Sequence, residues 1–470
     1  MVDIAGIKPA PRSAWGREVS ATLLLAWPLI LTNLTQVAFG LTDVIMMGWL
    51  GPESLAAGAL ATNLNFALVI FGIGVVSATS PIIASELGRN RHSVREVRRT
   101  VRQGTWAAIV VSVPILLILW HSEPILLALG QEPRLAAEAA AYNRTLMWSA
   151  PCFLGYIGLR NFVSALQRPM AVLGVGIIAV ALNALVVWAL MFGHFGLPAL
   201  GLRGAGIGTT ITTAFLFIGV ALTIRLDRRF HRYRLLGRFW RPDWPRFREI
   251  WRLGLPIALT LCFEVTVFNA AAFLMGLISP ESIAAYAIAI QIASFAFMVP
   301  LGLGMAATVR VGRAYGARDW DAAARAGAAA WWLALGYACC TILIMTLGRR
   351  ELVGLFLPLE DAATQPVIEL AMSFVAFAGL FQFFDCSQGA AAGMLRGLQD
   401  TRVPMILTAV GYWGVGLPLS ILLAFPLGLA GTGIWIGLAA GLAVVAGLLT
   451  YRWLKRERFG LVGDSVAVAS

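Results

Sequence analysis

Three acidic residues stand inside long apolar stretches of the chain: Asp43, Glu264 and Asp385. Glu264 lies within LCFEVTVF at residues 261–268, and Asp385 directly follows two phenylalanines. A carboxylate at the centre of a membrane helix costs roughly 2.5–3.5 kcal/mol. We expect no Lys or Arg in the apolar interior of any membrane-spanning stretch, so an ordinary ion pair is not available to the acids. They therefore predict protonation, a bound cation or a water-filled cavity.

Amide side chains form a second group of polar residues in the apolar stretches. Among them are Gln36, Asn183 and Gln291. An amide on the face of a membrane helix usually hydrogen-bonds to a neighbouring helix. A role in the same site as the acids is the alternative, and the sequence leaves both interpretations open.

The composition places the whole chain in a membrane. It has 470 residues, of which 59% are hydrophobic and only 13% are charged, and its mean hydropathy is +0.79. A soluble globular chain carries about 25% charged residues. The five cysteines all lie in apolar runs without metal-ligand spacing, so we interpret them as core residues. The first twenty residues lack a signal-peptide pattern, so we expect the N-terminus to be retained.

Twelve apolar runs are long enough to cross a bilayer, since a spanning helix needs roughly 20 residues. The fold class that we predict is therefore an all-α integral membrane protein with twelve transmembrane helices. The runs lie near 19–46, 55–80, 103–122, 135–163, 170–192, 204–225, 250–277, 283–308, 324–346, 364–395, 403–425 and 429–451.

The basic residues orient these spans. If the N-terminus is cytoplasmic, 31 Lys and Arg residues fall on the inner side and 5 on the outer side. The positive-inside rule thus predicts that both termini are cytoplasmic. It also accounts for the net charge of +12 without nucleic acid, because no aromatic residues alternate with the arginines. The arginines from Arg225 to Arg252 could in addition bind anionic lipid.

The sequence repeats itself at an offset of 228 residues. Matching residues are spread over each half, for example Pro28 with Pro256 and Gly74 with Gly302. Six spans per half make the repeats parallel, so we predict two six-helix lobes related by an axis along the membrane normal. Their boundaries are 1–225 and 250–470, with a basic cytoplasmic linker at 226–249. Two lobes that rock about a central site are typical of a transporter.

The acids do not follow this repeat. The offset aligns Glu264 with Gln36 and Asp43 with Ala271. Each lobe therefore carries its own acid at a different point of a shared frame.

These features resemble the multidrug and toxic compound extrusion (MATE) family, and within it the bacterial NorM-type branch. The most specific stretches are GLTDVIMMG at residues 40–48, LGLP at 253–256 and LRGLQDT at 395–401, and the resemblance covers essentially the whole chain. The first lobe departs from the pattern, with ALQRP at 165–169 in place of the RGLQD loop.

The resemblance implies two six-helix lobes that export cationic, lipophilic compounds against inward Na⁺ or H⁺. It also implies site roles for Asp43, Glu264 and Asp385, and for Asn183 on the fifth helix. We therefore predict a cation-coupled antiporter in the bacterial inner membrane that works as a monomer. A Na⁺ at Glu264 and Asp385 is possible, and no other cofactor is expected.

Other functions fit the sequence less well. A flippase for lipid-linked saccharides is the main alternative, but it would need a basic cavity for an anionic headgroup, and the spans are poor in arginine. An enzyme is not favoured, because the four histidines are scattered near loops and no HExxH pattern occurs. The sequence contains no phosphate-binding GxxxxGK[ST] loop, so ATP-driven export is not favoured. A channel would more often use a ring of identical subunits than two unlike lobes.

Overall fold

The computed structural model of the chain describes residues 14–235, 237, 239–359 and 364–463, and within these ranges all regular structure is helical. The N-terminal half consists of α1 (Ala14–Leu50), α2 (Pro52–Ser77), α3 (Thr79–Arg89), α4 (Val94–Trp120), α5 (Ser122–Ala128), α6 (Pro133–Leu146), α7 (Ser149–Ala165), α8 (Met170–Phe192) and α9 (Leu202–Leu226). The short helix α10 (Arg228–His231) follows. The C-terminal half consists of α11 (Trp244–Ile278), α12 (Pro280–Gly316), α13 (Trp320–Leu347), α14 (Arg349–Gly354), α15 (Gln365–Gly397), α16 (Arg402–Ala409), the π-helix η2 (Val410–Gly416), α17 (Leu417–Ala424) and α18 (Ala430–Leu454).

The helices confirm an all-helical membrane protein. Eleven of them, in the described part of the chain, are long and apolar enough to cross a membrane. The remaining predicted span, 135–163, is divided between α6 and α7. Pro151 stands in the first turn of α7, where it cannot donate a hydrogen bond to the preceding turn. The count of twelve membrane crossings stays a prediction. In that count, α6 and α7 together form the fourth crossing.

The eleventh predicted span contains a π-helical turn between α16 and α17. This turn carries three glycines and is followed by Pro418, whose missing N–H frees a carbonyl one turn earlier. Wider turns of this kind often occur at functional sites in helices.

The apolar cores follow the two halves except where α11 crosses to the N-terminal half. One cluster joins α2, α3, α4, α7 and α9 and also takes in Ile250, Leu253, Ile257 and Ala258 of α11, and a second lies between α1, α2, α6 and α8. In the C-terminal half, α15 is central and packs against α12, α13 and α18. The boundaries of the lobes, 1–225 and 250–470, stay a prediction. The helix α11 begins at Trp244, inside the predicted linker, and the basic residues Lys8 and Arg12 lie outside the described residues.

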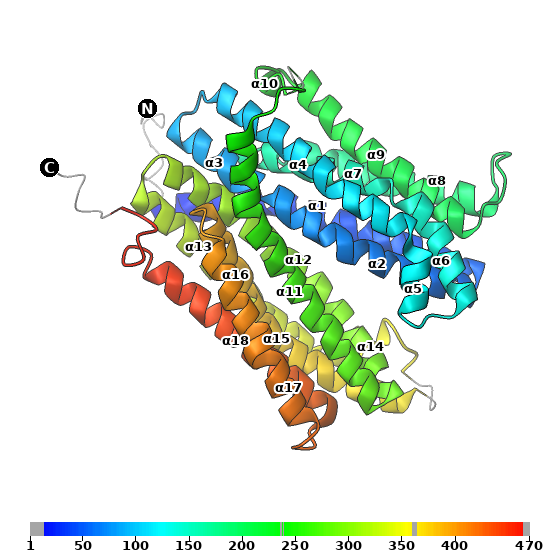
Figure 1. Cartoon of the computed structure of the whole chain (residues 1–470). Helices are drawn as coiled ribbons and strands as arrows, with labels where there is room; N and C mark the ends of the chain where they lie inside the picture. The colour runs from blue at the N-terminus through cyan, green and yellow to red at the C-terminus, as the bar shows by residue number, and fades with distance from the viewer. Residues whose placement is uncertain (1–13, 236, 238, 360–363, 464–470) are drawn as a thin grey trace, which may run out of the picture.

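The two halves meet at the end of the molecule where both termini lie. Figure 1 shows them side by side at that end and diverging toward the opposite end, where α6 and α17 lie apart. The junction is made by α1 and α12 and by α2 and α11. An apolar cluster that includes Leu25 and Leu29 of α1 and Leu303 of α12 fills part of it. We call this end the junction end.

Glycines let the two halves approach closely at symmetric points. A Cβ added to Gly74 would lie 2.2 Å from the Cα of Ala258, and one added to Gly302 would lie 3.1 Å from the backbone nitrogen of Ile30. The two contacts are equivalent in the repeat, because Gly74 aligns with Gly302 and Ile30 aligns with Ala258 at the offset of 228 residues. The internal repeat therefore governs the packing, and the halves meet through equivalent surfaces.

A second symmetric pair of contacts lies nearer the junction end. A Cβ on Gly88 would lie 1.9 Å from the carbonyl oxygen of Arg313, and one on Gly316 would lie 1.9 Å from the carbonyl oxygen of Ser85. These two contacts are also related by the offset of 228. Only glycine permits backbones to approach this closely.

The loop that departs from the expected family pattern has the same backbone as its partner. Gln167 and Gln399 both end a helix with positive φ, of 60° and 61°. In each turn, the next residue donates to a carbonyl five positions earlier, from Arg168 to Val163 at 3.2 Å and from Asp400 to Leu395 at 3.0 Å. The difference in sequence therefore leaves the turn unchanged.

We expect Gly88→Ala and Gly316→Ala each to lower the apparent melting temperature in detergent. The added methyl group meets backbone and cannot move aside, a class of change that costs about 1–3 kcal/mol. The matched control is Gly447→Ala in α18, where the new Cβ meets nothing within 4 Å. Equal melting temperatures for the three variants would contradict the close approach of α3 and α12.

Candidate functional site

Asp43 lies on α1 with its side chain almost fully buried. Its relative exposure is 8%, and its Oδ2 accepts a hydrogen bond of 2.8 Å from the hydroxyl of Thr209 on α9. Its Oδ1 is buried and has no hydrogen-bond partner among the described residues. One oxygen of this carboxyl group is therefore free to bind a proton or a cation.

Asn183 of α8 lies beside Asp43. Its side chain is fully buried, and within the described ranges neither amide atom has a partner that meets ordinary hydrogen-bond geometry. Tyr142 of α6 is buried within electrostatic range of Asp43. Helices α1, α6, α8 and α9 thus bring four polar side chains to one place in an apolar half.

Thr209 was missed by sequence reasoning, although the sequence held a signal for it. Glycines at 204 and 208 bring α9 against the backbone of α8, because added Cβ atoms would lie 2.5 Å from the carbonyl oxygen of Leu190 and 3.0 Å from the Cα of Val187. This close packing places the neighbouring hydroxyl within reach of α1. Alternating glycines followed by a threonine in an apolar span are a pattern that could have predicted it.

Glu264 and Asp385 come together in the C-terminal half. Glu264 lies half-buried on α11, Asp385 is 5% exposed on α15, and the two carboxyl groups lie within electrostatic range of each other. Oδ1 of Asp385 is buried and has no hydrogen-bond partner in the described part of the chain. None of the three acids forms a salt bridge with the described residues. The described residues also hold no cluster of three or more His, Cys, Asp or Glu side chains, the kind of group that binds multivalent metals.

The π-helix η2 borders this acid pair. Trp413 donates a hydrogen bond of 3.4 Å to the carbonyl of Phe263, the residue before Glu264. Tyr412 is 1% exposed, lies within electrostatic range of both acids, and its hydroxyl has no partner in the described ranges. The irregular turn therefore carries a buried hydroxyl to the pair, which the sequence did not indicate.

Basic side chains come closer to the polar residues than the sequence predicted. Arg160 is 6% exposed within α7, because that helix continues to Ala165. Its Nη1 donates to Oδ1 of Asn33 at 3.3 Å. Arg396 lies within electrostatic range of Glu264 and borders a cavity of about 10 Å³, roughly the space of one water molecule. The expectation that the spans hold no basic side chain was therefore wrong for Arg160.

The two glutamines have different surroundings. Gln36 on α1 lies next to Tyr156 of α7, and its Nε2 has no hydrogen-bond partner among the described residues. Gln291 on α12 is exposed. Neither is hydrogen-bonded to one of the three acids in the described structure, so their assignment to the site stays a prediction.

This arrangement of polar groups within diverging helical halves defines a multi-pass membrane transporter, and comparison with known proteins agrees. The MatE family model matches residues 28–189 and 256–422, so the matched region takes in all three acids. The chain belongs to the MatE family, whose members are transporters and not enzymes.

Curated relatives match over nearly the whole chain. A protein of Mesorhizobium japonicum named "Probable multidrug resistance protein NorM" is 57% identical over 96% of each chain. One of Rhizobium meliloti with the same name is 42% identical over 95% of each chain.

Solved structures share the fold at lower identity. The eukaryotic MATE transporter AtDTX14 has a TM-score of 0.83 at 22% identity, covering 95% of this chain and 98% of its own. A multidrug resistance MATE transporter described in an outward-facing conformation has a TM-score of 0.84 at 19% identity, covering 95% and 97%.

We expect Thr209→Val to lower the melting temperature, since it removes the hydrogen bond that Asp43 accepts from the Thr209 hydroxyl. Hydrogen bonds between membrane helices contribute about 0.6 kcal/mol on average and up to about 1.7 kcal/mol. Thr209→Ser keeps the hydroxyl and is the matched control. A melting temperature of Thr209→Val equal to that of the wild type would contradict a stabilising role of this hydrogen bond.

Proposed function

We propose that the chain exports cationic, lipophilic drugs across the bacterial inner membrane in exchange for Na⁺ or H⁺. The single observation that carries this proposal is the unpaired state of the buried acids. Asp43 and Asp385 each keep an oxygen without a partner among the described residues, and none of the three acids is salt-bridged there. In a membrane interior, such groups need a positive ion or a proton. The curated relatives named as multidrug resistance proteins support drugs as the cargo.

The proposed coupling is a competition for negative charge. When the site faces outward, H⁺ or Na⁺ reaches Glu264 and Asp385 and neutralises the pair, so a bound organic cation is released. The halves then move so that the site faces inward, where loss of the ion restores the charge and attracts the next cation. Asp43 with Thr209 and Asn183 offers a second site of the same chemistry in the other half.

The divergence of the two halves supports alternating access. They are packed tightly at the junction end and separate toward the other end. The positive-inside pattern assigns the junction end to the cytoplasm, so this form would be open outward. The fold resembles that of a MATE transporter described as outward-facing.

The acids favour this function over a lipid-linked saccharide flippase. An anionic headgroup would need basic groups in a central cavity, whereas Arg160 is buried against Asn33. We further propose that the protein works as a monomer, because each chain holds both halves and both groups of acids.

Substitution of the paired acids tests the site. In proteoliposomes, we expect Glu264→Gln and Asp385→Asn each to lower gradient-driven ethidium efflux by roughly tenfold or more, because coupling free energies of 1–3 kcal/mol correspond to about 5- to 150-fold. The control is Glu53→Gln, because the side chain of Glu53 is 68% exposed whereas Asp385 is 5% exposed. Normal efflux in both site variants would refute the assignment.

The driving ion is tested by imposing Na⁺ and pH gradients separately. We expect at least one of them to drive efflux in the absence of ATP, and we expect the same ion to weaken equilibrium binding of ethidium to the wild type. In Glu264→Gln that weakening should be smaller, because one of the two paired charges that the ion and the drug share is removed. Efflux that needs neither gradient would exclude antiport.

A further inference from the structure

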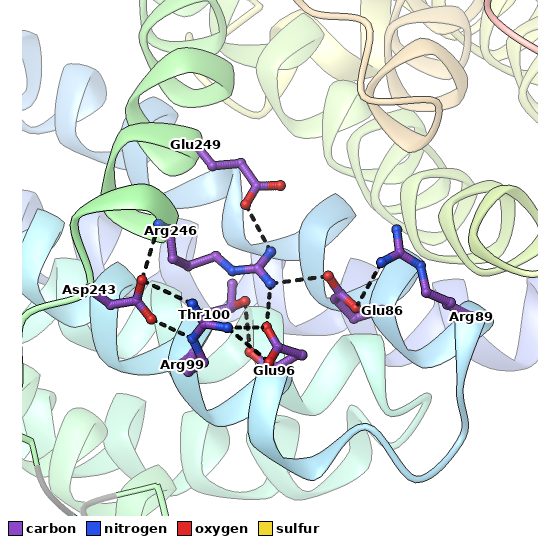
Figure 2. A network of polar contacts seen from close by, with 8 residues as sticks. All are labelled: Glu86, Arg89, Glu96, Arg99, Thr100, Asp243, Arg246 and Glu249. Carbon is purple, nitrogen blue, oxygen red and sulfur yellow. Dashed lines mark hydrogen bonds and ion pairs between the residues drawn. The ribbon is translucent and has the colours of Figure 1, made fainter.

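A buried arginine at the junction end is surrounded by carboxylates from both halves. Arg246, in the first turn of α11, has a side chain that is only 9% exposed. Its guanidinium reaches Glu86 of α3 at 3.1 Å, Glu96 of α4 at 2.7 Å and Glu249 of its own helix at 2.8 Å. Figure 2 shows the guanidinium between these three acids. The first helix of the C-terminal half is therefore ion-paired to two helices of the N-terminal half.

A neighbouring pair strengthens the same link. Asp243 caps the N-terminus of α11 through Arg246 N–H, and it also accepts two hydrogen bonds from Arg99 of α4, of which that from Nη2 is 3.1 Å long (Figure 2). The Arg99 guanidinium holds the pKa of Asp243 below its ordinary value. The carboxylate thus stays charged, and Arg99 also pairs with Glu96 at 2.8 Å.

A second bridge joins the halves through the other pair of junction helices. Arg310 of α12 donates to Oε1 of Glu18 on α1 from Nε at 2.9 Å and from Nη2 at 2.5 Å. Their side chains are 21% and 14% exposed. This bridge links the first helix of the N-terminal half to the C-terminal half.

The two bridges are related by the internal repeat, but their charges are reversed. Glu18 shifted by 228 is Arg246, so an acid on α1 corresponds to a base on α11. Glu86 shifted by 228 is Ala314, one helical turn from Arg310 on α12. The repeat therefore places one ionic link at each of two equivalent crossings, beside the close glycine contacts of Gly88 and Gly316.

We propose that these two bridges, Arg246 with Glu86 and Glu96 and Arg310 with Glu18, form a two-part ionic lock that keeps the junction end closed. The lock holds the present conformation and must break when the halves separate there. It goes beyond the coupling-ion site and rests on the alternating-access part of the proposed function.

The burial of these charges explains why the lock can be both strong and reversible. An exposed pair such as Arg134 with Glu53, with side chains 70% and 68% exposed, contributes little to stability. Removing one partner of a buried pair leaves an unpaired charge in a poorly solvated place, which is strongly unfavourable. Separation of the halves admits water to all of the charges, so the open state avoids that penalty.

The lock is tested by measuring the separation of the halves at this end. Spin labels are placed at His92→Cys and Ala317→Cys, two exposed positions in different halves, in full-length protein without its five native cysteines. We expect the wild type to give mainly a short distance. Glu18→Gln and Arg246→Gln should each raise the ratio of long to short distances by roughly tenfold, as loss of a buried ion pair implies.

A charge exchange separates the ionic effect from a folding defect. The double variant Glu18→Arg with Arg310→Glu should return the distances to the wild-type distribution, and the exposed variant Arg134→Gln should leave them unchanged. Unchanged distances in Glu18→Gln and Arg246→Gln would overturn the lock. So would a shift that the exchanged pair does not reverse. The distance measurement needs neither a drug nor an ion gradient. It can therefore disprove the lock while Glu264→Gln still abolishes efflux, and it can support the lock even if Glu264→Gln leaves efflux normal.

Discussion

The hydrocarbon interior offers no water to a charged group, and this constraint governs how the chain places its acids. A carboxylate there must be protonated, hold a cation or lie in a wet cavity. Asp43 receives one hydrogen bond from Thr209 and keeps its other oxygen unpaired within the described structure. Glu264 and Asp385 lie together although their negative charges repel each other. Both groups are unfavourable when empty and ionised, and this is what makes them suited to binding a positive ion.

The same constraint is met differently at the junction end. There the acids are paired with arginines, as in the bridges of Arg246 and Arg310. Charges that are paired hold two surfaces together, whereas charges that are left unpaired attract a ligand from outside. Under the proposed function, the chain uses carboxylates in two roles, with structural pairs where the halves touch and unpaired acids within the halves.

The repeat gives symmetric packing but asymmetric chemistry. The contacts of Gly74 and Gly302 are equivalent, and so are those of Gly88 and Gly316. The acids are not equivalent, since Glu264 aligns with Gln36 and Asp43 with Ala271. Close backbone contacts tolerate only glycine and so preserve the symmetry, while a side chain that faces a site can change without disturbing the crossing. Two halves of one shape can thus carry different binding groups.

The sequence by itself determined the membrane class, the order of the apolar spans and the positions of the three acids within them, because these features can be read directly from the order of residues along the chain. It did not reveal that span 135–163 is divided near Pro151, or that Arg160 is buried within α7. Only the tertiary structure decided which polar groups meet. Thr209 with Asp43 and Arg246 with Glu86 are each separated by more than 150 residues, and their approach depends on how helices cross, which no local pattern records.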